Sequence, residues 1–119
     1  MDQYFEGLTN IAITVCDEDG NILDMNQHSA DVNSHGHKII GSNLMACHPE
    51  PAKIKLKGML ERHELNVYTI EKTLADGTKV KKLINQTPWY KEDGSFGGLV
   101  EYSMEIPFEM PHYVRQPKP

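Results

Sequence analysis

Residues 11–33 read IAITVCDEDGNILDMNQHSADVN, and this stretch decides the fold. Two strand-like runs of apolar residues flank the dipeptide Asp19-Gly20. An Asp-Gly pair in that position is a strong hairpin signal, and it predicts a type I′ turn with positive φ at both central residues. Asn26 then offers the side chain of a helix N-cap, which predicts a short helix over residues 27–33. The order is therefore strand, turn, strand, helix.

The same turn signal recurs twice, at Asp76-Gly77 and Asp93-Gly94. Strand-like runs flank each of these dipeptides as well, and strands joined by such tight turns pair antiparallel. The sequence thus predicts a hairpin near the start of the chain and a three-stranded meander near its end. The predicted strands cover residues 11–16, 22–25, 67–74, 80–90 and 96–106.

The last of these strands has the clearest alternation. Its even positions from 96 to 106 are apolar or glycine, whereas Glu101, Ser103 and Glu105 hold the other parity. A period of two is typical of a half-buried strand, so we expect the even positions, Tyr102 among them, to face the core.

The middle of the chain is helical in pattern, with a longer helix expected over residues 49–63. Pro49 is tolerated in a first turn, and Leu56, Leu60 and His63 recur at helical spacing. The fold class is therefore α+β: a five-stranded antiparallel sheet with residues 26–63 packed on one face. We expect one domain over residues 1–106 and a Pro-rich tail over residues 107–119, which packs on the body or on a partner through its apolar side chains.

Composition excludes several function classes. The chain has 119 residues and a formal net charge of −5, which fits one domain and argues against a nucleic-acid partner. No apolar run is long enough for a membrane span, and the start lacks a signal peptide, so we expect a cytoplasmic protein with no membrane contact. Two cysteines are too few for a disulfide framework. Paired carboxylates, a phosphate loop and a nucleophile elbow are not recognisable, so we expect no enzyme.

The order of these elements resembles a PAS domain over residues 5–106. Ile40-Gly41 resembles the dipeptide between the short helices of that family, and the segment from Asp93 to Gly98 resembles the turn into its last strand. The run Cys47-His48-Pro49 looks like a segment found in one PAS branch, in small bacterial proteins and beside hemerythrin-like domains.

The resemblance implies a five-stranded antiparallel sheet that cradles helices, often around a small-molecule cavity, and a sensor or interaction role. It also implies a homodimer, since PAS-like sheets associate through their outer face or an N-terminal segment. Tyr4, Phe5 and Leu8 are apolar residues that need such cover. One departure is Pro107, which blocks the C-terminal helix through which signalling PAS domains drive an output domain.

Cys47 and His48 are the leading candidates for ligand contacts, because they precede a helix N-terminus. His48 can instead cap the helix while Cys47 packs as a small apolar side chain, or its imidazole can ligate haem iron or another metal. A zinc site that adds His35 and His37 matches no standard spacing, so we predict no metal site.

Tyr68, Gln86 and Tyr102 lie on three consecutive predicted strands, each with apolar neighbours two residues away. If these faces point at the helices, their polar ends project into a mainly apolar pocket. The amide of Asn26 is a weaker candidate on the other side of the same core.

The sequence therefore predicts a PAS-type sensor in signal transduction that binds a small organic molecule between sheet and helices. The ligand and any cofactor stay unidentified at this stage, and a separate signalling partner is expected. Two alternatives stay open: a haem- or metal-binding redox or gas sensor that uses His48, and a protein-interaction subunit with a filled core.

Overall fold

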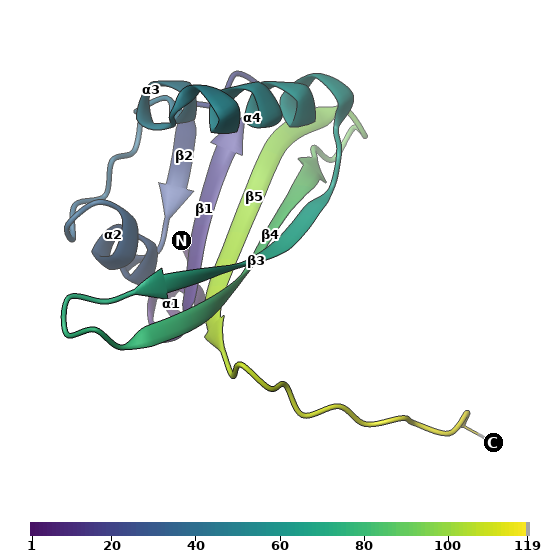
Figure 1. The fold of residues 1–119 in the computed structure, drawn as a ribbon. Helices are drawn as coiled ribbons and strands as arrows, with labels where there is room; N and C mark the ends of the chain where they lie inside the picture. The colour runs from purple at the N-terminus through teal and green to yellow at the C-terminus, as the bar shows by residue number, and fades with distance from the viewer. Residues whose placement is uncertain (119) are drawn as a thin grey trace.

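A computed structural model describes residues 1–118, apart from the side chain of Cys47. All five strands form one antiparallel sheet in the order β2-β1-β5-β4-β3, which confirms the predicted α+β fold (Figure 1). The strands are β1 (Ile11–Asp17), β2 (Ile22–Met25), β3 (Asn66–Thr73), β4 (Lys79–Tyr90) and β5 (Phe96–Ile106). The helices are α1 (Gln3–Glu6), α2 (Gln27–Asn33), α3 (Leu44–Cys47) and α4 (Glu50–Arg62).

The three Asp-Gly dipeptides do join adjacent strands, but their turns differ from the predicted type I′. Gly20, Gly77 and Gly94 have φ near +85°, whereas no aspartate is among the residues of positive φ. Each loop has three residues, closed by a hydrogen bond from the N–H of the residue before it to the carbonyl of the residue after it: Asp17 to Asn21, Leu74 to Thr78 and Lys91 to Ser95. A three-residue loop takes a type I turn followed by one left-handed residue, so only the glycine needs positive φ.

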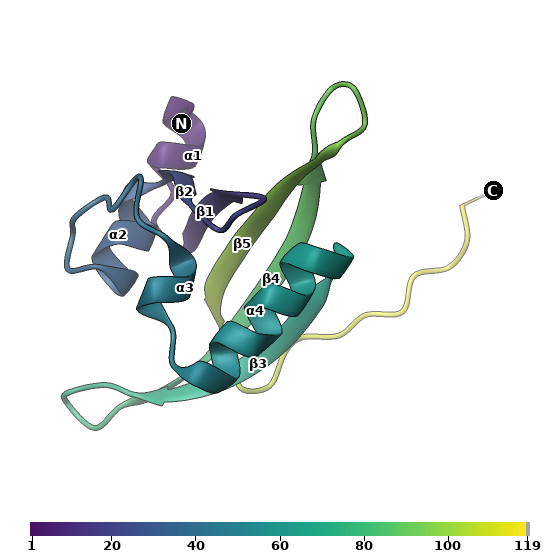
Figure 2. The same ribbon diagram turned by 90° about the horizontal axis from the view of Figure 1, so that it is seen from above.

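Helices α2, α3 and α4 lie on one side of the sheet (Figure 2). The predicted cap is confirmed, since Asn26 accepts a hydrogen bond from the Ser29 N–H at the start of α2. Helix α4 begins after Pro49 and ends at Arg62, and its C-cap residue His63 adopts a left-handed conformation with φ of 56°. The four-residue helices α1 and α3 were not predicted, because a single turn carries no periodic signal.

The facing of β5 was predicted correctly at Phe96, which packs on the cluster of Leu56 and Met59, but wrongly beyond Gly98. Leu99 is 4% exposed and packs with the same two residues of α4, so the odd positions from Leu99 onward face the helices. Tyr102 therefore lies on the opposite, outer face of the sheet. Gly98 has φ of +147° and precedes Leu99, and the pairing register shifts beside it, between Trp89 and Tyr90. Alternation shows that two faces differ, and a local irregularity decides which one meets the helices.

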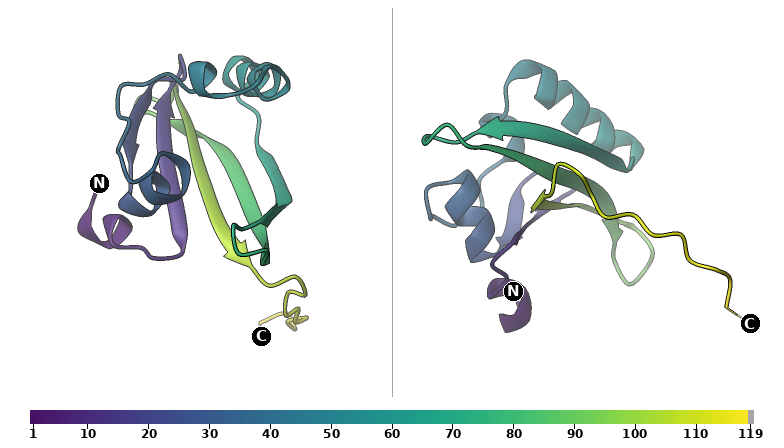
Figure 3. Two further views of the ribbon diagram at one scale, coloured as in Figure 1. Left: turned by 60° about the vertical axis from the view of Figure 1, so that its left-hand side comes forward. Right: turned by 60° about the horizontal axis from the view of Figure 1, so that its bottom comes forward.

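Residues 107–118 contain no helix or strand and extend away from the end of β5 (Figure 3). Their side chains are exposed, so the tail does not pack on the body of the domain. In the described part of the chain the longest helix has 13 residues, and none is long and apolar enough to cross a bilayer.

Candidate functional site

Three adjoining hollows lie between the helices and the sheet, and His48 and Glu101 line all three. The largest has a volume of about 340 Å³ and lies under α4, against β3 and β4. The other two have volumes of about 220 and 30 Å³. The largest alone reaches the size of small-molecule sites in proteins, which begins at about 300 Å³.

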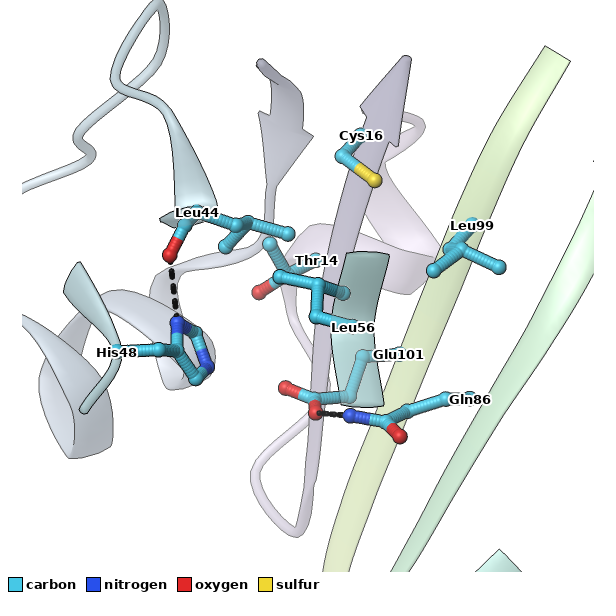
Figure 4. Close-up of a pocket in the computed structure, with 8 residues that line it drawn as sticks. All are labelled: Thr14, Cys16, Leu44, His48, Leu56, Gln86, Leu99 and Glu101. Atoms are coloured by element: carbon cyan, nitrogen blue, oxygen red, sulfur yellow. Dashed lines mark hydrogen bonds between the residues drawn. The ribbon is translucent and has the colours of Figure 1, made fainter. Parts of the chain in front are cut away.

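His48 occupies the short connection between α3 and α4. Its backbone is extended, with φ of −114° and ψ of 144°, as expected for a residue before proline. The imidazole Nδ1 lies 2.6 Å from the carbonyl oxygen of Leu44 (Figure 4). A carbonyl can only accept, so Nδ1 donates this hydrogen bond, and when the ring is neutral its Nε2 is an acceptor. Figure 4 shows this second nitrogen on the side of the ring that faces Glu101.

Opposite His48, a chain of amides and a carboxylate crosses three strands of the sheet. Asn66 Nδ2 donates to Gln86 Oε1 at 2.9 Å, and Gln86 Nε2 donates to Glu101 Oε1 at 2.8 Å. Because Asn66 occupies the oxygen of the Gln86 amide, the NH₂ end of that amide is turned toward Glu101. The sheet thereby holds the Glu101 carboxylate in one orientation at the edge of all three hollows.

The charge of Glu101 affects its neighbours. The pKa of Tyr68 is raised, first by burial and then by repulsion from the Glu101 carboxylate. The pKa of Cys16 is also raised, mainly by burial and to a smaller extent by Asp17 and Glu101. Tyr68 and Cys16 would each have to ionise close to an existing negative charge, so their surroundings favour the neutral phenol and thiol.

Apolar side chains complete the walls. Leu44, Leu56 and Leu99 line the hollow that Figure 4 shows, together with Cys16. On the side of α2, the hydroxyls of Thr14 and Ser29 are 2.5 Å apart. The lining is therefore apolar around most of its surface, with a few polar groups in defined directions.

No protein-family model matches the chain, and no curated protein matches it by sequence. Solved structures do match. The PAS domain of a Colwellia psychrerythraea protein is 21% identical with a TM-score of 0.62, and the match covers 87% of this chain and 92% of that one. The PAS domain of Bordetella pertussis BvgS is 17% identical with a TM-score of 0.64, covering 87% of this chain and 82% of that one. The chain has the PAS fold.

A third match is a structure of VqmA bound to DPO, at 14% identity and a TM-score of 0.67. The match covers 88% of this chain and 55% of that one. At these identities the matches establish the fold, and the PAS resemblance predicted from the sequence is confirmed at that level.

The PAS fold brings together three of the six residues selected from the sequence. His48, Tyr68 and Gln86 all line the largest hollow. Tyr102 does not, because it pairs with Asn85 and Ile13 on the outer face, whereas Gln86 pairs with Glu101.

The other two selected residues have different outcomes. The side chain of Cys47 lies outside the described part of the structure. Asn26 lines none of the hollows and makes four hydrogen bonds within the core: its Oδ1 accepts from the N–H groups of Ile13 and Ser29, and its Nδ2 donates to the carbonyls of Phe5 and Ile11.

Sequence reasoning missed Glu101, the residue that faces His48. Strand pairing is the feature that identifies it, because Glu101 lies directly opposite Gln86, which the sequence analysis named as a candidate site residue. Directly opposed residues share a face, so Gln86 and Tyr102 could not both point inward.

Metal ligands do not gather in the described residues: no group of three or more His, Cys, Asp or Glu side chains is placed to hold a metal ion. His35 and His37 lie on an exposed connection after α2.

Proposed function

We propose that the chain is a PAS sensor module that holds a small organic molecule between α3, α4 and the sheet. The observation that carries the proposal is the arrangement of His48, Gln86 and Glu101 around one hollow of about 340 Å³, whose apolar wall is formed by Ala52, Leu56 and Met59. Apolar walls with a few convergent polar groups are how small-molecule sites are built. The structure of VqmA bound to DPO supports the proposal, since the match to this chain covers 55% of a protein that is bound to DPO there.

In this proposal the chain acts by binding rather than by catalysis. His48 is the main anchor, because its ring position is set by the bond to Leu44 and its other nitrogen is available to a ligand. The module works in the cytoplasm as a homodimer and reports ligand binding to a separate signalling protein.

Native mass spectrometry and an absorption spectrum of the purified protein test this function. We expect the protein to carry extra mass from a bound molecule and to show no visible absorption band. The extra mass should be reduced in His48→Ala and lost in Ala52→Phe, because the phenyl ring fills the hollow that Ala52 lines. Ala46→Phe is the matched control, because Ala46 is exposed on α3. Removing one partner of a buried hydrogen bond costs about 1–3 kcal/mol of binding free energy.

The alternatives are separate outcomes of the same measurement. A Soret band that disappears in His48→Ala would indicate haem on Nε2 of His48 and would overturn the organic ligand. Absence of both the band and the mass increment, with no binding of added small molecules, would favour an interaction subunit with a filled core.

A further inference from the structure

We propose that the hollow is selective for a small organic cation, an amine whose N–H groups donate to Glu101 and His48. This inference rests on the proposed function and adds the chemical class of the ligand. It follows from the hydrogen-bonding groups and the charge that the structure directs into the hollow.

The groups opposed across the hollow are both acceptors. Glu101 Oε1 accepts from Gln86, and Oε2 has no hydrogen-bond donor among the described residues. Nε2 of neutral His48 is also an acceptor, because Nδ1 carries the proton that bonds to the Leu44 carbonyl. A ligand that meets both groups must therefore bring donors, and an ammonium group has up to three N–H bonds.

Charge favours a cation over a neutral donor. None of the ion pairs among the described residues includes Glu101, and its hydrogen-bonding neighbour, Gln86, is neutral. Lys55 lines the same hollow, but it is exposed and makes no ion pair with Glu101. A partly buried carboxylate without a counter-charge attracts a cation and repels an anion more strongly than it would in bulk water.

The polar network keeps the carboxylate in place for such a ligand. Asn66 fixes the direction of the Gln86 amide, and Gln86 fixes one oxygen of Glu101. Ala52, Leu56 and Met59 line the same hollow and face the region where the carbon skeleton of the amine would lie. The hollow therefore offers a charged end and an apolar wall in one site.

Three probes of nearly one shape test the inference. At pH 7 phenethylamine is a cation, 2-phenylethanol is neutral and phenylacetate is an anion, and each is titrated by calorimetry and by amide NMR shifts. We expect phenethylamine to bind at least tenfold more tightly than phenylacetate. Glu101→Gln keeps the shape and the bond to Gln86, and we expect it to weaken phenethylamine at least fivefold while leaving 2-phenylethanol unchanged.

Glu105→Gln is the matched control, because it removes the same charge from the same strand at an exposed position outside these hollows. Equal weakening by both variants would show a general charge effect and would overturn the inference.

The outcomes separate this inference from the proposed function. If phenylacetate or 2-phenylethanol binds as tightly as the amine, with NMR shifts around His48, the cation selectivity is wrong and the binding function stands. If no probe binds at 10 mM, the inference is overturned, and the proposed function then depends on the mass measurement of the purified protein alone.

Discussion

The side-chain amide of Asn26 joins β1, α1 and α2 through hydrogen bonds to their backbone. The side chain is fully buried, and each of its polar atoms bonds to backbone on β1, α1 or α2. The sequence predicted the cap correctly because capping depends on local chemistry. It could not show the bonds to Phe5 and Ile11, which depend on how distant segments meet.

Replacing Asn26 should therefore affect stability rather than binding. We expect Asn26→Ala to lower the free energy of unfolding by about 2–4 kcal/mol, because the cap is lost and buried backbone groups lose their partners. Asn26→Asp keeps the capping oxygen and loses the two donated bonds, so its loss should be smaller. Urea unfolding measures both, and a loss under 1 kcal/mol in Asn26→Ala would contradict this role.

Cys16 provides a test of burial at a single position. Its side chain is 1% exposed and its pKa is raised, mainly by burial. The folded state therefore holds the thiol proton more tightly than the unfolded state, and the stability this contributes is lost as pH rises through the folded pKa. We expect alkylation of Cys16 at pH 8.5 to be at least 100-fold slower in the native protein than in urea, since only the thiolate reacts.

Peptide mass mapping assigns this reaction to Cys16 separately from Cys47. Similar rates of Cys16 labelling in native and unfolded protein would show that the thiol is accessible and that the core around Leu56 opens readily.

At the scale of elements, most strand ends were predicted within about one residue, because Asp-Gly turns and alternation are local signals. The facing of β5 was not, and its cause lies across the sheet. The Trp89 indole donates to the Cys16 carbonyl at 3.0 Å and crosses β5 at Gly97 and Gly98. A Cβ at Gly97 would overlap that ring, and one at Gly98 would overlap backbone of β1. These contacts explain why glycine occupies positions 97 and 98. They join residues far apart in the sequence, so the local pattern around the two glycines does not predict them.

Helix α4 contains a glycine that the structure does not require. Gly58 is in the helix interior, and the three atoms nearest to an added Cβ all belong to the guanidinium of Arg62, a flexible and exposed side chain. We expect Gly58→Ala to raise the free energy of unfolding by about 0.5 kcal/mol. The gain in helix propensity, about 1 kcal/mol, should exceed the loss of the exposed pair between Arg62 and Glu64.

Ala52→Gly on the same helix should lower stability by a similar propensity difference, which makes it the opposing control in the urea measurement. A Gly58→Ala variant that loses more than 1 kcal/mol would show that the close packing of this helix depends on Gly58.

At the scale of the whole molecule, the sheet has two faces of different character. The face toward the helices carries Thr14, Gln86 and Glu101, so it leaves a hollow with polar groups. The outer face carries the apolar alternation of β5 that the sequence displayed so clearly. The prediction assumed that the apolar side of β5 packs against the helices, as is usual for a sheet covered on one face. This assumption fails here because the inner face of the sheet carries polar side chains around a cavity.

The apolar outer face is the surface on which we expect the homodimer to form. Val100, Tyr102 and Met104 lie at alternate positions along β5, and the paired strand β1 adds Ile11 and Val15 opposite Met104 and Val100.

A stable interface buries about 800 Å² on each partner, and an unpaired charge inside it is costly. We expect sedimentation equilibrium at tens of micromolar to give a dimer for the native chain and a monomer for Tyr102→Lys. Ile54→Lys adds the same charge at a residue of α4 that is 71% exposed, and it should stay dimeric. A monomeric native chain would refute the dimer, and a dimeric Tyr102→Lys would place the interface elsewhere, with the exposed N-terminal residues as the next surface to test.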